Sequence, residues 1–78
     1  MSSHFARYTS RYQAQLQARA LNAWRDTELV VRARWDAFLV ADGASRRDAF
    51  AAYVTALDAE AAAAGDLADA SSDLAEAA

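Results

Sequence analysis

Residues 41–50, ADGASRRDAF, contain the one clear turn signal of this chain. Gly43 stands where a helix ends and a positive φ is needed, which glycine adopts without steric cost. Two residues later, Ser45 is a good N-cap for a second helix. Asp48 follows at the third helical position, where its negative charge complements the helix dipole. A stop signal followed so closely by a start signal predicts a tight connection between two antiparallel helices.

The composition on both sides of the turn favours helix throughout. Alanine occupies 23 of the 78 positions, proline is absent, and Gly43 and Gly65 are the only glycines. Alanine has the highest helix propensity, whereas proline in a helix interior would cost about 3 kcal/mol. We therefore predict an all-α fold, an antiparallel αα-hairpin with a long helix over about 4–41 and a second helix over about 46–64.

Gly65 is expected to end the second helix and to separate two parts of the chain. Residues 1–64 would form the helical hairpin domain, and residues 65–78 would form an acidic, alanine-rich C-terminal segment. Asp66 could cap a short third helix over 66–77. Alanine-rich segments of this length are marginal alone, so a frayed tail is the alternative.

Apolar residues recur at helical spacing in both arms and predict the hairpin core. Folding the chain at Gly43 places Phe38 opposite Phe50 and Trp35 opposite Tyr53. On the second helix, Phe50, Val54, Leu57, Ala61 and Ala64 alternate spacings of four and three, as in a coiled-coil seam. The predicted hairpin core consists of Leu21, Trp24, Val31, Trp35, Phe38, Phe50, Tyr53, Val54 and Leu57.

The charges divide between the two arms. Residues 1–47 contain eight arginines and four acidic residues, whereas residues 48–78 contain seven acidic residues and no basic one. The arms therefore carry +4 and −7, within a net charge of −3. Opposite charges favour antiparallel contact, within one chain or between chains.

The chain has more apolar side chains than two helices can cover. It contains eight aromatic residues, and Leu29, Val30, Leu39 and Val40 make the end of the first helix apolar on more than one face. A large exposed apolar patch usually marks an interface. We expect a homodimer in which two hairpins form a four-helix bundle, or a larger protein assembly that covers the same surface. The predicted interface consists of Phe5, Tyr8, Tyr12, Leu16, Leu29 and Val40.

The sequence lacks the residue sets on which common enzyme chemistry depends. His4 is the only histidine, and there is no cysteine. Zinc and di-iron sites need several such ligands, nucleophilic triads need a positioned base, and phosphate loops need clustered glycines. We therefore predict no catalytic residues, no metal site and no cofactor.

Glu28 is the one charged residue inside the apolar pattern of the first helix, between Trp24 and Val31. A buried carboxylate there could belong to a functional site. The simpler interpretation is that Glu28 pairs with Arg25 or Arg32 on the same helix, at the edge of the apolar stripe. A single polar residue in a seam can also set the register of a bundle, which makes Glu28 a register candidate.

We therefore predict a non-catalytic helical protein–protein interaction module, a small self-associating scaffold, adaptor or accessory subunit. The alternative is a small nucleic-acid-associated regulator that uses the arginine-rich and aromatic-rich first helix. The net charge of −3 argues against that alternative. Bilayer spanning needs about 20 apolar residues in a row, and the chain has no such run. Its first residues, MSSHFARYTSRYQ, lack the apolar region of a secretory signal, so we expect a cytoplasmic protein without a membrane partner.

Overall fold

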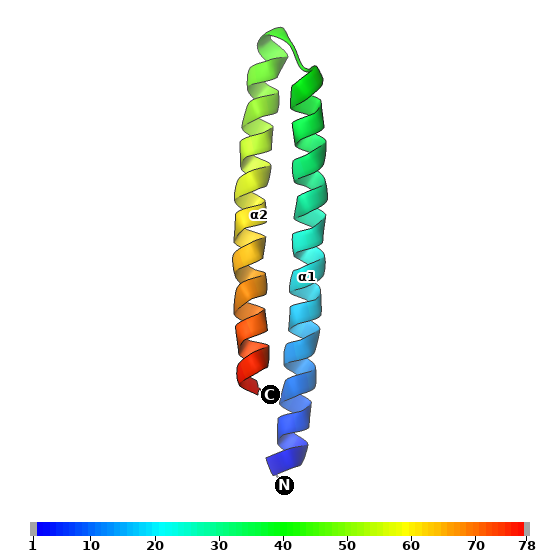
Figure 1. The fold of residues 1–78 in the computed structure, drawn as a ribbon, viewed down its shortest axis with the longest axis vertical. Helices are drawn as coiled ribbons and strands as arrows, with labels where there is room; N and C mark the ends of the chain where they lie inside the picture. The colour runs from blue at the N-terminus through cyan, green and yellow to red at the C-terminus, as the bar shows by residue number, and fades with distance from the viewer. Residues whose placement is uncertain (1, 78) are drawn as a thin grey trace.

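The computed structural model describes the backbone of residues 2–77 and the side chains of residues 11–76. It contains two helices, α1 (Ser2–Val40) and α2 (Gly43–Ala77), which pack antiparallel along their length (Figure 1). No strand occurs in residues 2–77. The predicted all-α helical hairpin is thus confirmed.

The connection between the helices is made by residues 41 and 42 together with Gly43. Gly43 has a φ of +53°, the left-handed conformation that was predicted for it and that L-residues other than glycine adopt only with strain. At the end of α1, the Ala41 amide donates a hydrogen bond of 3.2 Å to the Phe38 carbonyl, which tightens the last turn.

The start of α2 differs slightly from the prediction. The helix begins at Gly43, so Ser45 and Asp48 lie inside its first two turns rather than at a cap and at the third helical position. Helix ends are the part of an element that sequence signals locate least accurately, typically to within one or two residues.

The predicted end of the second helix at Gly65 is wrong. α2 continues through Gly65 to Ala77, and Gly65 does not have the positive φ of a helix-terminating glycine. Glycine inside a helix costs only about 1 kcal/mol relative to alanine. The residues that follow regain this cost, because Leu67, Ala70 and Leu74 are partly buried along the hairpin. Residues 65–77 are therefore part of α2 and form neither a separate third helix nor a frayed tail.

The register of the hairpin is the same at both ends. Near the turn, Phe38 contacts Phe50 and Trp35 contacts Tyr53, as the folding of the chain at Gly43 predicts. Far from the turn, the Gln17 side-chain amide donates a hydrogen bond of 3.2 Å to the Ser71 hydroxyl. Trp35 and Gln17 are separated by as many residues as Tyr53 and Ser71, so the helices stay in step past Gly65.

The face of α2 that packs on α1 differs by one residue from the predicted seam. Its partly or fully buried positions alternate spacings of three and four and are rich in alanine. We call this row the inner stripe; it consists of Ala49, Tyr53, Ala56, Glu60, Ala63, Leu67, Ala70 and Leu74. Ala56, at 7% exposure, is the one buried hydrophobic residue among those described. The hairpin by itself therefore has almost no fully buried core.

The matching face of α1 mixes apolar and polar residues. Partly buried positions include Gln13, Gln17, Trp24, Thr27 and Val31. The Thr27 hydroxyl donates a hydrogen bond of 2.6 Å to the Trp24 carbonyl, which satisfies this polar group without a partner from α2.

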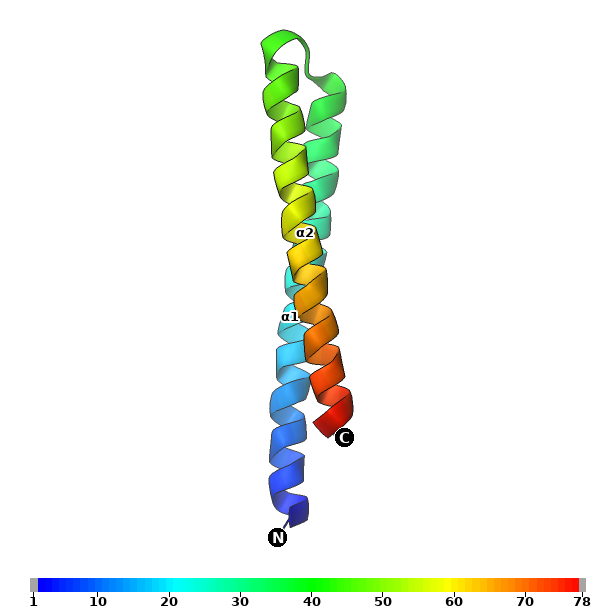
Figure 2. The same ribbon diagram turned by 90° about the vertical axis from the view of Figure 1, so that its left-hand side faces the viewer.

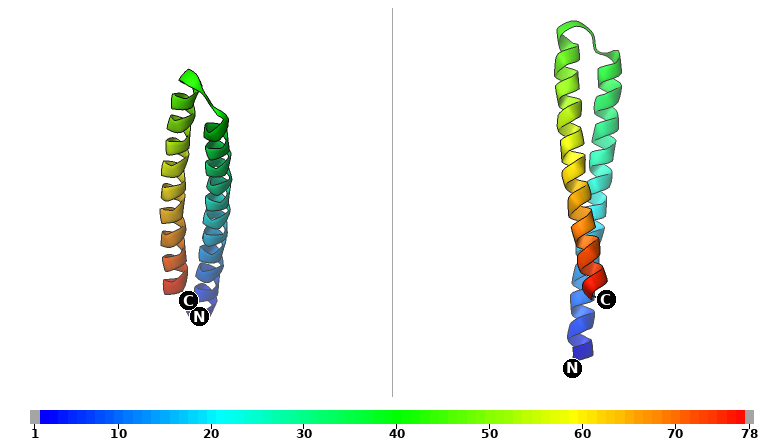
Figure 3. Two further views of the ribbon diagram at one scale, coloured as in Figure 1. Left: turned by 45° about the horizontal axis from the view of Figure 1, so that its top comes forward. Right: turned by 60° about the vertical axis from the view of Figure 1, so that its left-hand side comes forward.

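The molecule is a thin rod whose Cα trace measures 66 × 13 × 11 Å. Its radius of gyration is 18.1 Å, whereas a globular domain of this length would have roughly 11.5 Å. The helices cross at a shallow angle, as Figure 2 shows, in the manner of coiled-coil packing. Both termini lie at the end opposite the turn, and the first turns of α1 extend beyond the end of α2 (Figure 3).

Candidate interaction surface

Four aromatic rings form a cluster near the turn. The ring centroids of Trp35 and Tyr53 lie 5.1 Å apart, those of Trp35 and Phe38 5.5 Å, and those of Phe38 and Phe50 5.6 Å. Phe50 and Tyr53 complete the cluster at 6.5 Å. These separations and the tilted ring planes are typical of stabilising aromatic pairs. The cluster is open to solvent on one side, since Trp35 is exposed and half of the Phe50 surface remains accessible.

A second apolar row on α2 begins at Phe50 of this cluster and continues along the side of the helix that α1 leaves uncovered. All of its members are exposed. We call it the outer stripe; it consists of Phe50, Val54, Leu57, Ala61, Ala64 and Ala68. Its spacing of four, three, four, three and four is as regular as that of the inner stripe. The sequence predicted most of this row as the hairpin seam, and the structure leaves it on the surface.

The two stripes of α2 point in directions that suit two neighbouring helices. Each outer position follows an inner position by one residue, and 3.6 residues per turn separate them by about 100°. A helix at one corner of a four-helix bundle contacts neighbours in two such directions. α1 occupies one of them.

α1 adds large exposed side chains between the turn and the level of the middle of α2. Leu29 is 67% exposed and Val40 is 84% exposed, and Val30 and Leu39 are also exposed. Val30 and Leu39 are not among the predicted interface residues. Their signal was the pair of apolar runs at 29–31 and 38–40, which cannot all face a single partner helix.

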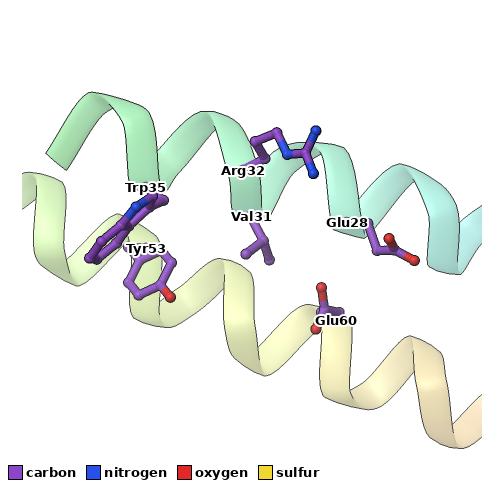
Figure 4. Close-up of a pocket in the computed structure, with 6 residues that line it drawn as sticks. All are labelled: Glu28, Val31, Arg32, Trp35, Tyr53 and Glu60. Carbon is purple, nitrogen blue, oxygen red and sulfur yellow. The ribbon is translucent and has the colours of Figure 1, made fainter. Parts of the chain in front are cut away.

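A shallow groove of about 350 Å³ runs between the helices beside the aromatic cluster (Figure 4). Trp35 and Tyr53 line one end, Val31 and Arg32 the middle, and the carboxylates of Glu28 and Glu60 lie at the other end. The groove is open, and its lining changes along its length from apolar to charged, with both an arginine and two glutamates. It therefore suits the side chains of a packed partner better than an enclosed small ligand.

The opposite side of the hairpin is different in character. A separate shallow depression there is lined by Val30 and Arg34 of α1 and by small residues of α2, Ala52, Thr55, Ala56 and Ala59. The Thr55 hydroxyl donates a hydrogen bond of 3.0 Å to the Ala51 carbonyl of its own helix. The exposed large apolar residues of α2, which are Phe50, Val54 and Leu57, thus lie on the side that carries Trp35.

The predicted interface residues are distributed along α1. Tyr12, Leu29 and Val40 are exposed, and Leu16 is partly buried against α2. The side chains of Phe5 and Tyr8, like that of His4, lie outside the described residues.

The predicted core residues divide into two groups. Leu21, Trp24, Val31, Phe38 and Tyr53 are partly buried between the helices. Trp35, Phe50, Val54 and Leu57 are exposed. Glu28 is also exposed, and Thr27 is partly buried in its place.

The total accessible surface of the hairpin is larger than that of a compact domain of the same mass. The accessible surface of the hairpin is 5983 Å², whereas a folded monomer of 8.4 kDa is expected to expose roughly 4,600 Å². The excess is about 1,400 Å², and a standard interface buries about 800 Å² on each partner. The hairpin thus exposes enough additional surface for a stable interface.

Metal-ligand groups and membrane-spanning stretches are both absent from the described residues. No group of three or more His, Cys, Asp or Glu side chains is arranged to hold a metal ion in the part of the chain that the structure describes. Neither helix, over those same residues, contains an apolar stretch long enough to cross a bilayer.

The comparisons with known proteins do not assign the chain to a family. No protein-family model, no curated protein and no solved structure matches it.

Proposed function

We propose that this protein is a non-catalytic protein–protein interaction module that self-associates through the exposed apolar side of its hairpin. In this role it is a small scaffold, adaptor or accessory subunit. The partner surface consists of the outer stripe together with Trp35 and Leu39. A cytoplasmic setting is part of the proposal, and cell fractionation tests it.

The observation that carries the proposal is the second apolar row on α2. A regular apolar row that no protein covers leaves its side chains in water, and covering them would be favourable. This row includes the exposed ring of Phe50 and lies beside the exposed ring of Trp35. Aromatic side chains are also the commonest energetic anchors of protein interfaces. The thin rod has no other way to bury Phe50, Val54 and Leu57, because α1 already occupies the inner stripe.

Sedimentation of three proteins at micromolar concentration tests the proposal. The unaltered chain is expected to sediment as an oligomer. Leu57→Glu places a charge in the outer stripe and is expected to weaken association by at least about tenfold, or 1.4 kcal/mol. Thr55→Glu introduces the same charge at an exposed position on the opposite side of α2 and should leave association unchanged.

Circular dichroism shows whether each variant remains helical. We expect both to do so, because glutamate is a good helix former. A well-folded monomer for the unaltered chain would refute the proposal. Equal weakening by Leu57→Glu and Thr55→Glu would show that the apolar side is not the contact surface.

A further inference from the structure

We infer that the outer stripe packs against the outer stripe of a second copy, with the two α2 helices antiparallel and the two-fold axis near residue 59. This inference rests on the proposed function and adds the partner and its orientation. In this arrangement the two turns lie at opposite ends of the dimer. α2 of each copy lies over α2 of the other, and α1 over α1.

The sizes of the side chains along the outer stripe support this orientation. The half of the stripe nearest the turn is bulky, with Phe50, Val54 and Leu57, and the half beyond is entirely alanine. Antiparallel packing brings Phe50 opposite Ala68, Val54 opposite Ala64 and Leu57 opposite Ala61. Large side chains then meet small ones in every layer, which is how cores reach native packing density.

The overlap of the helices is almost complete in this arrangement. α2 extends from Gly43 to Ala77, so its midpoint lies close to residue 59. A two-fold axis there leaves only the last residues of each α2 unpaired. The whole outer stripe is buried at once, without shifting either helix along the other.

The position of Leu29 on α1 independently supports a two-fold axis at the same level. The hairpin register, in which Trp35 faces Tyr53 and Gln17 faces Ser71, places Leu29 at the level of residue 59. Leu29 is 67% exposed and lines a shallow depression with Glu28 and two arginines at the outer edge of this side of α1, from which it can reach Leu29 of the second copy across the axis. A large apolar side chain that contacts its own symmetry mate is a common feature of isologous interfaces. Arg25 and Arg32 flank it and can keep their charged groups in water while their aliphatic stems cover the contact.

The charges on α2 agree with the antiparallel orientation. Residues 60–77 contain five acidic residues and no basic one, and Arg46 and Arg47 are the only basic residues of α2. The antiparallel arrangement places this arginine pair at the level of Ser71 and Ser72 of the second copy, between Asp69 and Asp73. It thus brings the basic end of each α2 to the acidic end of the other.

Cysteine cross-linking tests the arrangement directly, because the natural chain contains no cysteine. Val54→Cys and Ala64→Cys are made singly and together, and each protein is oxidised under mild conditions. Within one chain the two positions are ten residues apart, about 15 Å along the helix, too far for a disulfide. The double variant is expected to form a covalent dimer, and neither single variant should.

The control variant is Thr55→Cys/Ala62→Cys, at exposed positions on the opposite side of α2. It is expected to remain uncross-linked. Cross-linking by either single variant, or by the control as efficiently as by the Val54/Ala64 pair, would overturn the antiparallel stripe. Absence of cross-linking in the double variant would overturn it as well.

Sedimentation of the unaltered chain shows whether only the proposed arrangement fails or the proposed function fails as well. If that chain is an oligomer while the disulfide pattern is wrong, only the arrangement fails, and the proposed interaction module stands. If that chain is a folded monomer, both the arrangement and the proposed function fail.

Discussion

One arginine near the turn joins the ends of the two helices. The Arg46 guanidinium of α2 lies 4.4 Å from the centre of the Phe38 ring of α1. It also donates a hydrogen bond of 3.5 Å to the Ala41 carbonyl, just beyond the end of α1. A positive charge at the C-terminal end of a helix is favourable, and so is a cation over an aromatic face. Arg46 therefore ties the first turn of α2 back onto the last turn of α1.

We expect Arg46→Ala to lower the free energy of unfolding by about 0.5–1 kcal/mol, the usual value of an exposed cation–π contact. Urea denaturation at a fixed chain concentration measures it. Arg47→Ala is the matched control, because Arg47 is the adjacent exposed arginine and its substitution removes the same charge. Equal effects of the two substitutions would mean that the contact with Phe38 contributes nothing of its own.

A second residue-scale feature is a polar position inside the hairpin seam. The Gln13 side-chain oxygen is buried and has no hydrogen-bond partner. Sequence reasoning passed over Gln13, Gln17 and Thr27, because polar residues interrupt the apolar period that marks a seam. Their placement depends on the face that α2 covers, and the spacing of apolar residues in α1 alone does not specify it.

At the scale of the helices, the two glycines have opposite roles. Gly43 turns the chain with a positive φ, whereas Gly65 lies within α2 and has an ordinary helical backbone. In both cases an added Cβ would meet no other atom within 4 Å. The effect of a Gly→Ala substitution on the free energy of unfolding therefore depends on the backbone conformation at each position.

Gly65→Ala is expected to raise the free energy of unfolding by about 0.5–1 kcal/mol, because alanine restricts the unfolded chain and favours helix. Gly43→Ala is expected to lower it by about 1–2 kcal/mol, the cost of a left-handed conformation in an L-residue. Urea denaturation of both variants at one chain concentration measures these changes. Destabilisation by Gly65→Ala would indicate that α2 needs glycine there for a reason other than helix continuity.

At the scale of the whole molecule, the proposed self-association would couple the stability of the hairpin to its chain concentration. The hairpin has one buried hydrophobic residue, Ala56, among those described, and it exposes far more surface than a compact domain of its mass. In the proposed dimer, a second copy would bury apolar surface that this two-layer rod leaves exposed. Its melting temperature should therefore depend on chain concentration.

A tenfold increase in chain concentration adds about 1.4 kcal/mol to the stability of a dimer, and we expect the melting temperature to rise by a few degrees. Thermal unfolding followed by circular dichroism over two decades of concentration measures this change. The Leu57→Glu variant is expected to lose the dependence. A constant melting temperature for the unaltered chain would show that the hairpin is stable alone.

Much of the architecture could be predicted from the sequence, because it depends on local preferences. Helix propensity, the lack of proline and the turn signal at Gly43 act over a few residues and do not depend on distant contacts. The contacts of Phe38 with Phe50 and of Trp35 with Tyr53 follow from the position of that turn. Any antiparallel hairpin folded at Gly43 brings these residues together.

Two features were decided only by tertiary structure. α2 carries two rows of the same period, one residue apart; the outer row is wholly apolar and the inner row is interrupted by Glu60, so the apolar period favours the row that does not face α1. The structure selects the inner stripe, whose alanines allow close helix packing, and leaves the bulkier outer stripe exposed. Similarly, Gly65 reads locally as a stop signal, but its cost of about 1 kcal/mol is smaller than the burial that Leu67 and Leu74 gain along α1. Both outcomes depend on energies summed along the full length of two helices, which no short stretch of sequence contains.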